Sequence, residues 1–303
     1  MTDDEPRPRG VTSRWERVTE AVVVDDGYLK PLGAHHWAFY VEAKPVLLVS
    51  FDTVTAIREH ADRLPQYHAM ARARGWSHLC IISDGETWWR DPAVFAYFDQ
   101  LVDDGFMENF DQVVFYGQGA AGYAAGAYCA AAPGCEVVLV APRATLDPAR
   151  VPWEDRHPSA TGIDFSGRYS YAPDMIEAAE NVWLIHDPHH PADARHAALF
   201  AAPWVTPVFA RHTGDGTEDT LIEMRIFDKI MEATFAGAMS LRYFARLWRG
   251  RRSNASYLRE LLAVAESSGH TAREVMICRS VTRRLNAPRF ARRLAKLTGA
   301  DQR

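Results

Sequence analysis

The sequence predicts an α/β protein, in which a mostly parallel, doubly wound sheet is followed by a small C-terminal helical appendage. Six short runs of β-branched and apolar residues occur along the chain, and each is followed by a longer segment of helical character. Their apolarity is nearly continuous rather than alternating, which is typical of strands buried on both faces. Strands that alternate with helices form a parallel sheet with helices on both sides. From Asp219 onward, only helical periodicity is found.

Seven strands are predicted before this helical part. The six runs are residues 45–51, 78–83, 112–116, 136–142, 181–187 and 205–210. A further run, 37–43, ends just before the first of them, and we expect these two to form an antiparallel hairpin that opens the sheet. Between residues 146 and 180, proline, glycine, serine and aromatic residues accumulate. This composition predicts an excursion over the edge of the sheet, where segments that cover a substrate often lie.

Length and composition predict three regions. A chain of 303 residues, 48% of them hydrophobic, can bury a large core, which excludes a disordered or fibrous protein. We expect an N-terminal tail over residues 1–30, an α/β domain over 31–238 and a basic helical appendage over 239–303.

Charge is unevenly distributed along the chain. The formal net charge of −5 excludes a global attraction to nucleic acid, but residues 241–303 contain 15 Lys and Arg against 4 Asp and Glu. This excess predicts an acidic partner, RNA or a membrane surface for the C-terminal helices, unless it is only a solvated basic face.

The sequence also indicates where the protein resides. Its first ten residues are charged and proline-rich, without the apolar core of a signal peptide. No apolar run approaches the roughly 18 to 20 residues of a membrane span. The four cysteines show no C-x-x-C spacing, and three lie in or beside apolar runs. We therefore expect a soluble protein in a reducing cytoplasm.

The main functional question concerns three glycines that follow the third run. Gly117, Gly119 and Gly122 spell G-x-G-x-x-G between a strand and a helix, as in a dinucleotide fingerprint. Such a fingerprint normally follows the first strand of its domain, with an acidic residue about 20 positions later. Here two β–α units come first, and the next strand ends at Arg143 without a carboxylate. Because an arginine could hold a 2′-phosphate, NADP binding remains a further alternative.

A phosphoadenosine-phosphosulfate-type reductase is another alternative. It would need an S-G-G-type phosphate loop and a reactive C-terminal cysteine, and the sequence contains neither. Cys278 lies in an apolar helical run, which predicts a buried position.

The same glycines fit a different turn. The segment YGQGAAGYAA, residues 116–125, resembles the Y-G-S-S-M-G-G-Y-A-A nucleophile elbow of a branch of the α/β-hydrolase superfamily. Gly119 then occupies the position of the nucleophilic serine, and neither it nor Gln118 can act as a nucleophile. The resemblance extends roughly over residues 46–221. It implies an α/β-hydrolase-like domain in which serine hydrolase chemistry is not expected.

The resemblance also implies the other members of the site. The triad acid would be Asp187, at the end of the run 181–187, and the triad histidine would be His212, after the run 205–210, unless Asp215 stands in its place. The oxyanion donors would be the backbone N–H of Ala120 and a group in the loop near Asp52 or Thr53. These donors would bind an anion or a carbonyl even where no attack follows.

Other polar residues supply three further candidates. Asp84 follows the strand 78–83 at the carboxyl edge, where open α/β sheets bind ligands, and Gln118 lies beside the vacant position. Residues 186–196, HDPHHPADARH, contain four histidines and two aspartates. Such ligands could hold zinc or manganese and activate water, although the spacing matches no known metal motif.

The sequence therefore supports two functional hypotheses of different kinds. The first is a hydrolase-like protein with a degenerate elbow, without catalysis, cofactor or metal, that binds a small molecule or acts as a regulatory module. The second is an active hydrolase or transferase that uses water or a metal at residues 186–196.

Overall fold

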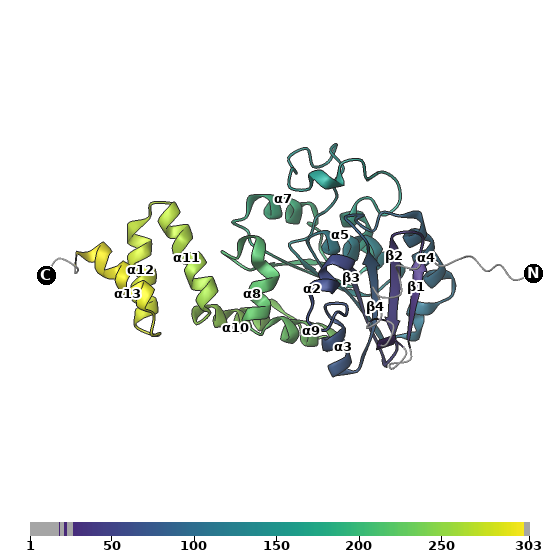
Figure 1. The fold of residues 1–303 in the computed structure, drawn as a ribbon, viewed down its shortest axis with the longest axis horizontal. Coiled ribbons are helices and arrows are strands. Elements are labelled where there is room, and N and C mark those ends of the chain that lie inside the picture. The colour runs from purple at the N-terminus through teal and green to yellow at the C-terminus, as the bar shows by residue number, and fades with distance from the viewer. Residues whose placement is uncertain (1–17, 19–20, 23–26, 300–303) are drawn as a thin grey trace, which may run out of the picture. The chain divides into compact units, whose positions relative to one another are not determined.

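The computed structural model describes residue 18, residues 21–22 and residues 27–299, and its described strands form an eight-stranded sheet (Figure 1). The strand order is β1-β2-β4-β3-β5-β6-β7-β8. The strands are β1 (Gly27–Leu32), β2 (His36–Val41), β3 (Lys44–Thr53), β4 (Trp76–Ser83), β5 (Gln112–Gln118), β6 (Glu136–Val140), β7 (Asn181–His186) and β8 (Val205–Phe209). β2 runs antiparallel to β1 and β4, whereas β3 pairs in parallel with β4 and β5, and β5 with β6. The six apolar runs are all strands, and the predicted α/β fold with a mostly parallel sheet is confirmed.

The predicted hairpin between β2 and β3 is wrong. β2 forms its hairpin with β1 and pairs on its other side with β4. β3 instead lies between β4 and β5 in the interior of the sheet. Its residues Leu47, Leu48 and Val49 are fully buried, which suits a strand whose two edges are both paired.

Helices and two apolar clusters cover both faces of the sheet. Along β2 and β4 consecutive residues belong alternately to one cluster or the other, as the alternation of side chains in a strand requires. The described helices are α2 (Val54–Glu59), α3 (His68–Arg74), α4 (Pro92–Asp103), α5 (Gly119–Tyr128), α6 (Ala172–Met175), α7 (Pro191–Leu199), α8 (Thr217–Glu223), α9 (Phe227–Phe235), α10 (Leu241–Leu247), α11 (Ala255–Ser267), α12 (Thr271–Thr282) and α13 (Pro288–Thr298). No described helix has both the length and the apolarity needed to cross a membrane.

The chain divides into two compact units. The first consists of residues 1–184 and 195–207, and the second of residues 185–194 and 208–303. The second unit is thus larger than the predicted appendage, which began at residue 239. Hydrogen bonds explain this extension: the Tyr257 hydroxyl donates to the Arg211 carbonyl (3.0 Å), and the Asn254 amide donates to the Glu223 carboxylate (3.3 Å).

Part of the predicted tail lies within the described residues. β1 begins at Gly27, and the buried Val18 and Val22 belong to one of the two apolar clusters of the first unit. The remainder of the predicted tail, residues 1–17, 19–20 and 23–26, lies outside the described residues.

The helices of the second unit are held by caps and by one ion-pair cluster. Ser240 and Asn254 cap α10 and α11 by accepting the N–H groups of the third residue beyond them. The Arg293 guanidinium on α13 bonds Glu274 on α12 (2.8 Å) and pairs with Glu266 on α11 (3.0 Å). Cys278 is fully buried in α12, as predicted, and all four cysteines are buried free thiols.

Candidate functional site

The segment with the three glycines forms a sharp turn from β5 into α5. Gly119, the first residue of α5, has φ +55°, and a Cβ added there would meet no atom within 4 Å. At Gly117, by contrast, an added Cβ would lie 2.1 Å from the Ala121 carbonyl oxygen. Gly117 therefore permits a close approach of strand and helix, whereas the space in front of Gly119 is open to a side chain.

The loop after β6 is bonded to this turn. The Arg143 backbone N–H donates to the Gly119 carbonyl at 3.1 Å. The Arg143 guanidinium donates to the Ala141 carbonyl (2.7 Å) and to His157 Nε2 (3.2 Å). The side chain on which the NADP interpretation depends is thus engaged within the protein, which weakens that interpretation.

Further along the same loop lies a buried pair that sequence reasoning missed. His196 Nδ1 accepts the Ala144 backbone N–H (3.2 Å), so its Nε2 carries the proton and donates to Glu154 Oε2 (2.8 Å). Burial alone would raise the pKa of Glu154, but hydrogen bonds from His196 and Arg156 hold it well below its usual value. No local pattern connects residues 154 and 196, so the sequence contains no signal for this pair.

Three of the predicted binding segments meet at one edge of the sheet. Asp52 and Thr53, Asp84, and Gln118 lie at or just beyond the carboxyl ends of β3, β4 and β5, which are neighbours running in the same direction. Ala120 follows in the first turn of α5. The parallel sheet therefore collects these polar groups at the edge where such folds bind ligands.

Two of these residues already have structural partners. The Asp52 carboxylate is buried and accepts the backbone N–H groups of Thr53 (2.7 Å) and Gln66 (2.9 Å). The Thr53 hydroxyl caps α2 by accepting the Ala56 N–H (3.1 Å). The N–H of Thr53 is thus engaged with Asp52, whereas the predicted donor at Ala120 lies at the start of a helix.

Asp187 lies in the second unit, directly after β7, and organises a loop there. Its carboxylate accepts the backbone N–H groups of His189 (2.9 Å) and Gly214 (3.0 Å), and His189 Nδ1 lies 3.2 Å away. Burial raises the pKa of Asp187, but these N–H donors outweigh it and hold the pKa below its usual value. The structure thus gives Asp187 an imidazole partner, His189, which the sequence analysis did not single out.

The predicted triad histidine, His212, has a different contact. Its ring stacks on the ring of His189 with centroids 4.3 Å apart and an interplanar angle of 12°. Burial, and then the neighbouring His189, lower the pKa of His212. Gly119 belongs to the first unit, whereas Asp187, His189 and His212 belong to the second.

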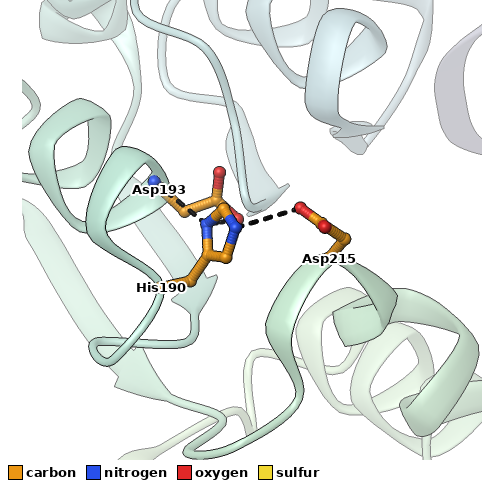
Figure 2. A group of neighbouring side chains, drawn as sticks. All are labelled: His190, Asp193 and Asp215. Atoms are coloured by element: carbon orange, nitrogen blue, oxygen red, sulfur yellow. Dashed lines mark hydrogen bonds and ion pairs between the residues drawn. The ribbon is translucent and has the colours of Figure 1, made fainter. Parts of the chain in front are cut away.

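A second histidine of the same loop lies between two carboxylates (Figure 2). His190 Nδ1 is 3.2 Å from Asp193 Oδ2, and His190 Nε2 is 3.1 Å from Asp215 Oδ1. Asp193 is 1% exposed, whereas the Asp215 side chain is 83% exposed. His190 and Asp215 border a cavity of about 560 Å³ within the second unit. Its other acidic and imidazole groups are Asp187, His189, His212, Asp219, Glu223 and Glu260.

Comparisons with known proteins were made at the level of sequence and structure. No family model matches the chain, and no curated protein matches its sequence. Among solved structures, the Glycosylation Associate Protein (Gap123) complex from Streptococcus agalactiae is 13% identical with a TM-score of 0.48. The alignment covers 69% of this chain but only 46% of that protein, less than half of its length.

Two further solved structures align over most of their own length. The capsule O-acetyltransferase of Neisseria meningitidis serogroup A is 11% identical with a TM-score of 0.43, over 66% of this chain and 93% of that one. Est1E from Butyrivibrio proteoclasticus is 11% identical with a TM-score of 0.41, over 69% of this chain and 99% of that one. These are likenesses between folds, and the activities belong to those proteins.

Proposed function

We propose that the chain is a non-catalytic, hydrolase-like protein that binds a small molecule without a covalent step. The observation that carries this proposal is Gly119, which lies at the strand-to-helix turn with φ +55° and has no side chain to attack a substrate. A serine in such a conformation costs roughly 1 to 3 kcal/mol, which an enzyme tolerates for its chemistry. Glycine adopts the conformation without that cost, so the shape of the turn can persist without the reaction.

The groups around Gly119 support binding of a carbonyl or carboxylate group. α5 begins at this residue and has no side-chain cap, and the first N–H groups of a helix have no intrahelical acceptor. They also lie at the positive end of the helix dipole, which favours an anion or a polarised oxygen. Asp84 and Gln118 at the same sheet edge would contact the remainder of the ligand.

Covalent labelling tests the absence of a nucleophile. We expect a serine-directed fluorophosphonate to leave the wild-type protein unlabelled, because no hydroxyl lies at position 119. Mass spectrometry of the digested protein would show any adduct, and an adduct within residues 113–126 would contradict the proposal.

Binding itself is tested by titrating short acyl esters and carboxylates into ¹⁵N-labelled protein. We expect the largest shift changes at the amide of Ala120.

The Gly119→Ser variant tests the geometry of the turn. We expect it to fold with a penalty of roughly 1 to 3 kcal/mol, because the space in front of residue 119 is open. Urea unfolding measures this penalty, and Gly119→Ala is the matched control because it has the same backbone strain without the hydroxyl.

A second role, for the helical unit, is favoured by a groove lined by apolar and basic residues. Its volume is about 660 Å³. Its apolar lining includes Leu258, Leu261, Met276, Ile277 and Val281, and its basic lining includes Arg211, Arg251, Arg252 and Arg284. Met276 is 70% exposed, which is high for an apolar side chain. We propose that this groove binds an acidic amphipathic segment of a partner protein.

A designed peptide tests this role. We expect a fluorescent helical peptide with a leucine stripe and glutamates elsewhere to bind, and its lysine counterpart to fail. Charge reversal at Arg251 and Arg284 should weaken binding about tenfold or more, because charges across an interface contribute to both attraction and register. Reversal of Arg279 and Arg292, which are exposed but do not line the groove, is the matched control. Equal losses in both variants would indicate only a general effect of charge.

A further inference from the structure

We propose that His190, Asp193 and Asp215 bind one divalent transition-metal ion. His190 lies in the loop after β7, Asp193 in the first turn of α7, and Asp215 in the short 3-10 helix Gly214–Gly216. Each offers one ligand atom, and these atoms all lie within 4.8 Å of one another. Figure 2 shows the imidazole held between the two carboxylates, which come from separate elements of the second unit.

Burial and charge favour a metal ion in this cluster. Asp193 is almost completely buried, and buried carboxylates in proteins are paired or coordinate metals. A divalent cation bound to one ring nitrogen of His190 and to one oxygen each of Asp193 and Asp215 would offset the charge of both carboxylates.

The surrounding cavity adds an independent argument. The described residues that line it include Asp187, Asp219, Glu223 and Glu260 but no lysine or arginine. A hollow lined by charges of one sign concentrates counter-ions, so the local field attracts a cation. Three protein ligands also leave coordination positions free, and water or an oxygen of a bound molecule can complete the shell.

The ligand types limit which ion fits. Imidazole nitrogen suits zinc, copper, iron and nickel, whereas carboxylate oxygen also suits manganese, magnesium and calcium. A set of one imidazole and two carboxylates therefore favours Zn²⁺ and Mn²⁺ over Mg²⁺ and Ca²⁺. The proposed cation site combines two residues of the segment 186–196 with Asp215, and it does not depend on the turn at Gly119.

Calorimetric titration of the full chain, stripped of metal with a chelator, tests the proposal with ZnCl₂, MnCl₂ and MgCl₂ as probes. We expect one Zn²⁺ per chain, weaker binding of Mn²⁺ and no binding of Mg²⁺. The variants His190→Gln and Asp215→Asn should each lose about 100-fold in Zn²⁺ affinity, because even residues behind the ligands typically change it by about 10 to 100-fold. Mn²⁺ should also give a broadened electron paramagnetic resonance signal in the wild type that Asp215→Asn abolishes.

Two variants serve as matched controls. Asp219 is an exposed carboxylate that lines the same cavity outside the cluster, and His270 is an exposed histidine before α12. His270→Gln should bind Zn²⁺ as the wild type does, and Asp219→Asn, which removes one charge of the cavity lining but no ligand, should lose far less affinity than Asp215→Asn. Near-UV circular dichroism confirms that each variant is folded.

Three outcomes would overturn the proposal. They are no stoichiometric binding by the wild type, equal affinity in wild type and His190→Gln, or an equal loss in Asp219→Asn and Asp215→Asn. The second outcome would show that Zn²⁺ binds adventitiously to other histidines. The third would show that the negative charge of the cavity attracts the ion without specific ligands. None of them affects the Gly119 proposal, whose test is labelling and ligand binding in the first unit.

Discussion

Gly117→Ala is expected to destabilise the first unit by more than about 4 kcal/mol, a loss at the extreme end for a single substitution. The added Cβ would lie 2.1 Å from the Ala121 carbonyl oxygen and 2.7 Å from the Gly122 nitrogen. Both are backbone atoms, so relief would require the start of α5 to move away from β5. Urea unfolding followed by circular dichroism measures the change in the free energy of unfolding.

Gly119→Ala is the matched control for this substitution. The same methyl group at residue 119 meets no atom within 4 Å, and its only cost is the left-handed backbone, about 1 to 2 kcal/mol. A Gly117→Ala variant as stable as Gly119→Ala would show that the close approach of β5 and α5 does not exist. A large loss at Gly119 alone would show that the space in front of the turn is filled.

Acidification is expected to destabilise the first unit on the order of 3 kcal/mol between pH 7 and pH 5, because two histidines are buried in neutral form. Burial lowers the pKa of His36 to about 4 and that of His78 to about 3. In the unfolded chain both titrate near 6.5, so the unfolded state takes up protons first as the pH falls. Their stabilisation is therefore complete above about pH 6.5 and is lost toward pH 4.

Urea titrations at several pH values measure this slope. His78 contacts the Ser50 hydroxyl through Nε2 at 2.8 Å, so His78→Gln keeps a polar group there while removing the titration. We expect His78→Gln to lower the slope between pH 7 and pH 5 by about half, and His270→Gln, in an exposed position, to leave it unchanged. If the free energy of unfolding falls equally with pH in wild type and His78→Gln, the pH dependence does not come from His78.

Much of the sheet could be predicted because a buried strand has a recognisable pattern in its own sequence. A strand covered on both faces contains an uninterrupted apolar run, and all six such runs are strands. The positive φ of Gly119 was likewise predictable, since the sequence places glycine at the one residue of the turn where a side chain would be strained. The gathering of Asp52, Asp84 and Gln118 at one edge follows from parallel strands alone.

The partners of strands and side chains depended on the tertiary structure. A short link between β2 and β3 is compatible with a hairpin, but β3 enters the interior of the sheet and β4 takes its place beside β2. The helices of residues 208–238 have the same amphipathic pattern whichever unit they join, so periodicity alone does not decide to which unit they belong.

The same division holds for the candidate sites. The sequence by itself determined that residue 119 has no nucleophile and that residues 186–196 concentrate imidazole and carboxylate groups. Only the tertiary structure decided that the Gly214 N–H donates to Asp187, 27 residues away in the chain, and that Asp215 lies beside His190, 25 residues away. Local patterns record how deeply a residue is buried, whereas contacts between distant residues depend on where the whole chain turns back on itself.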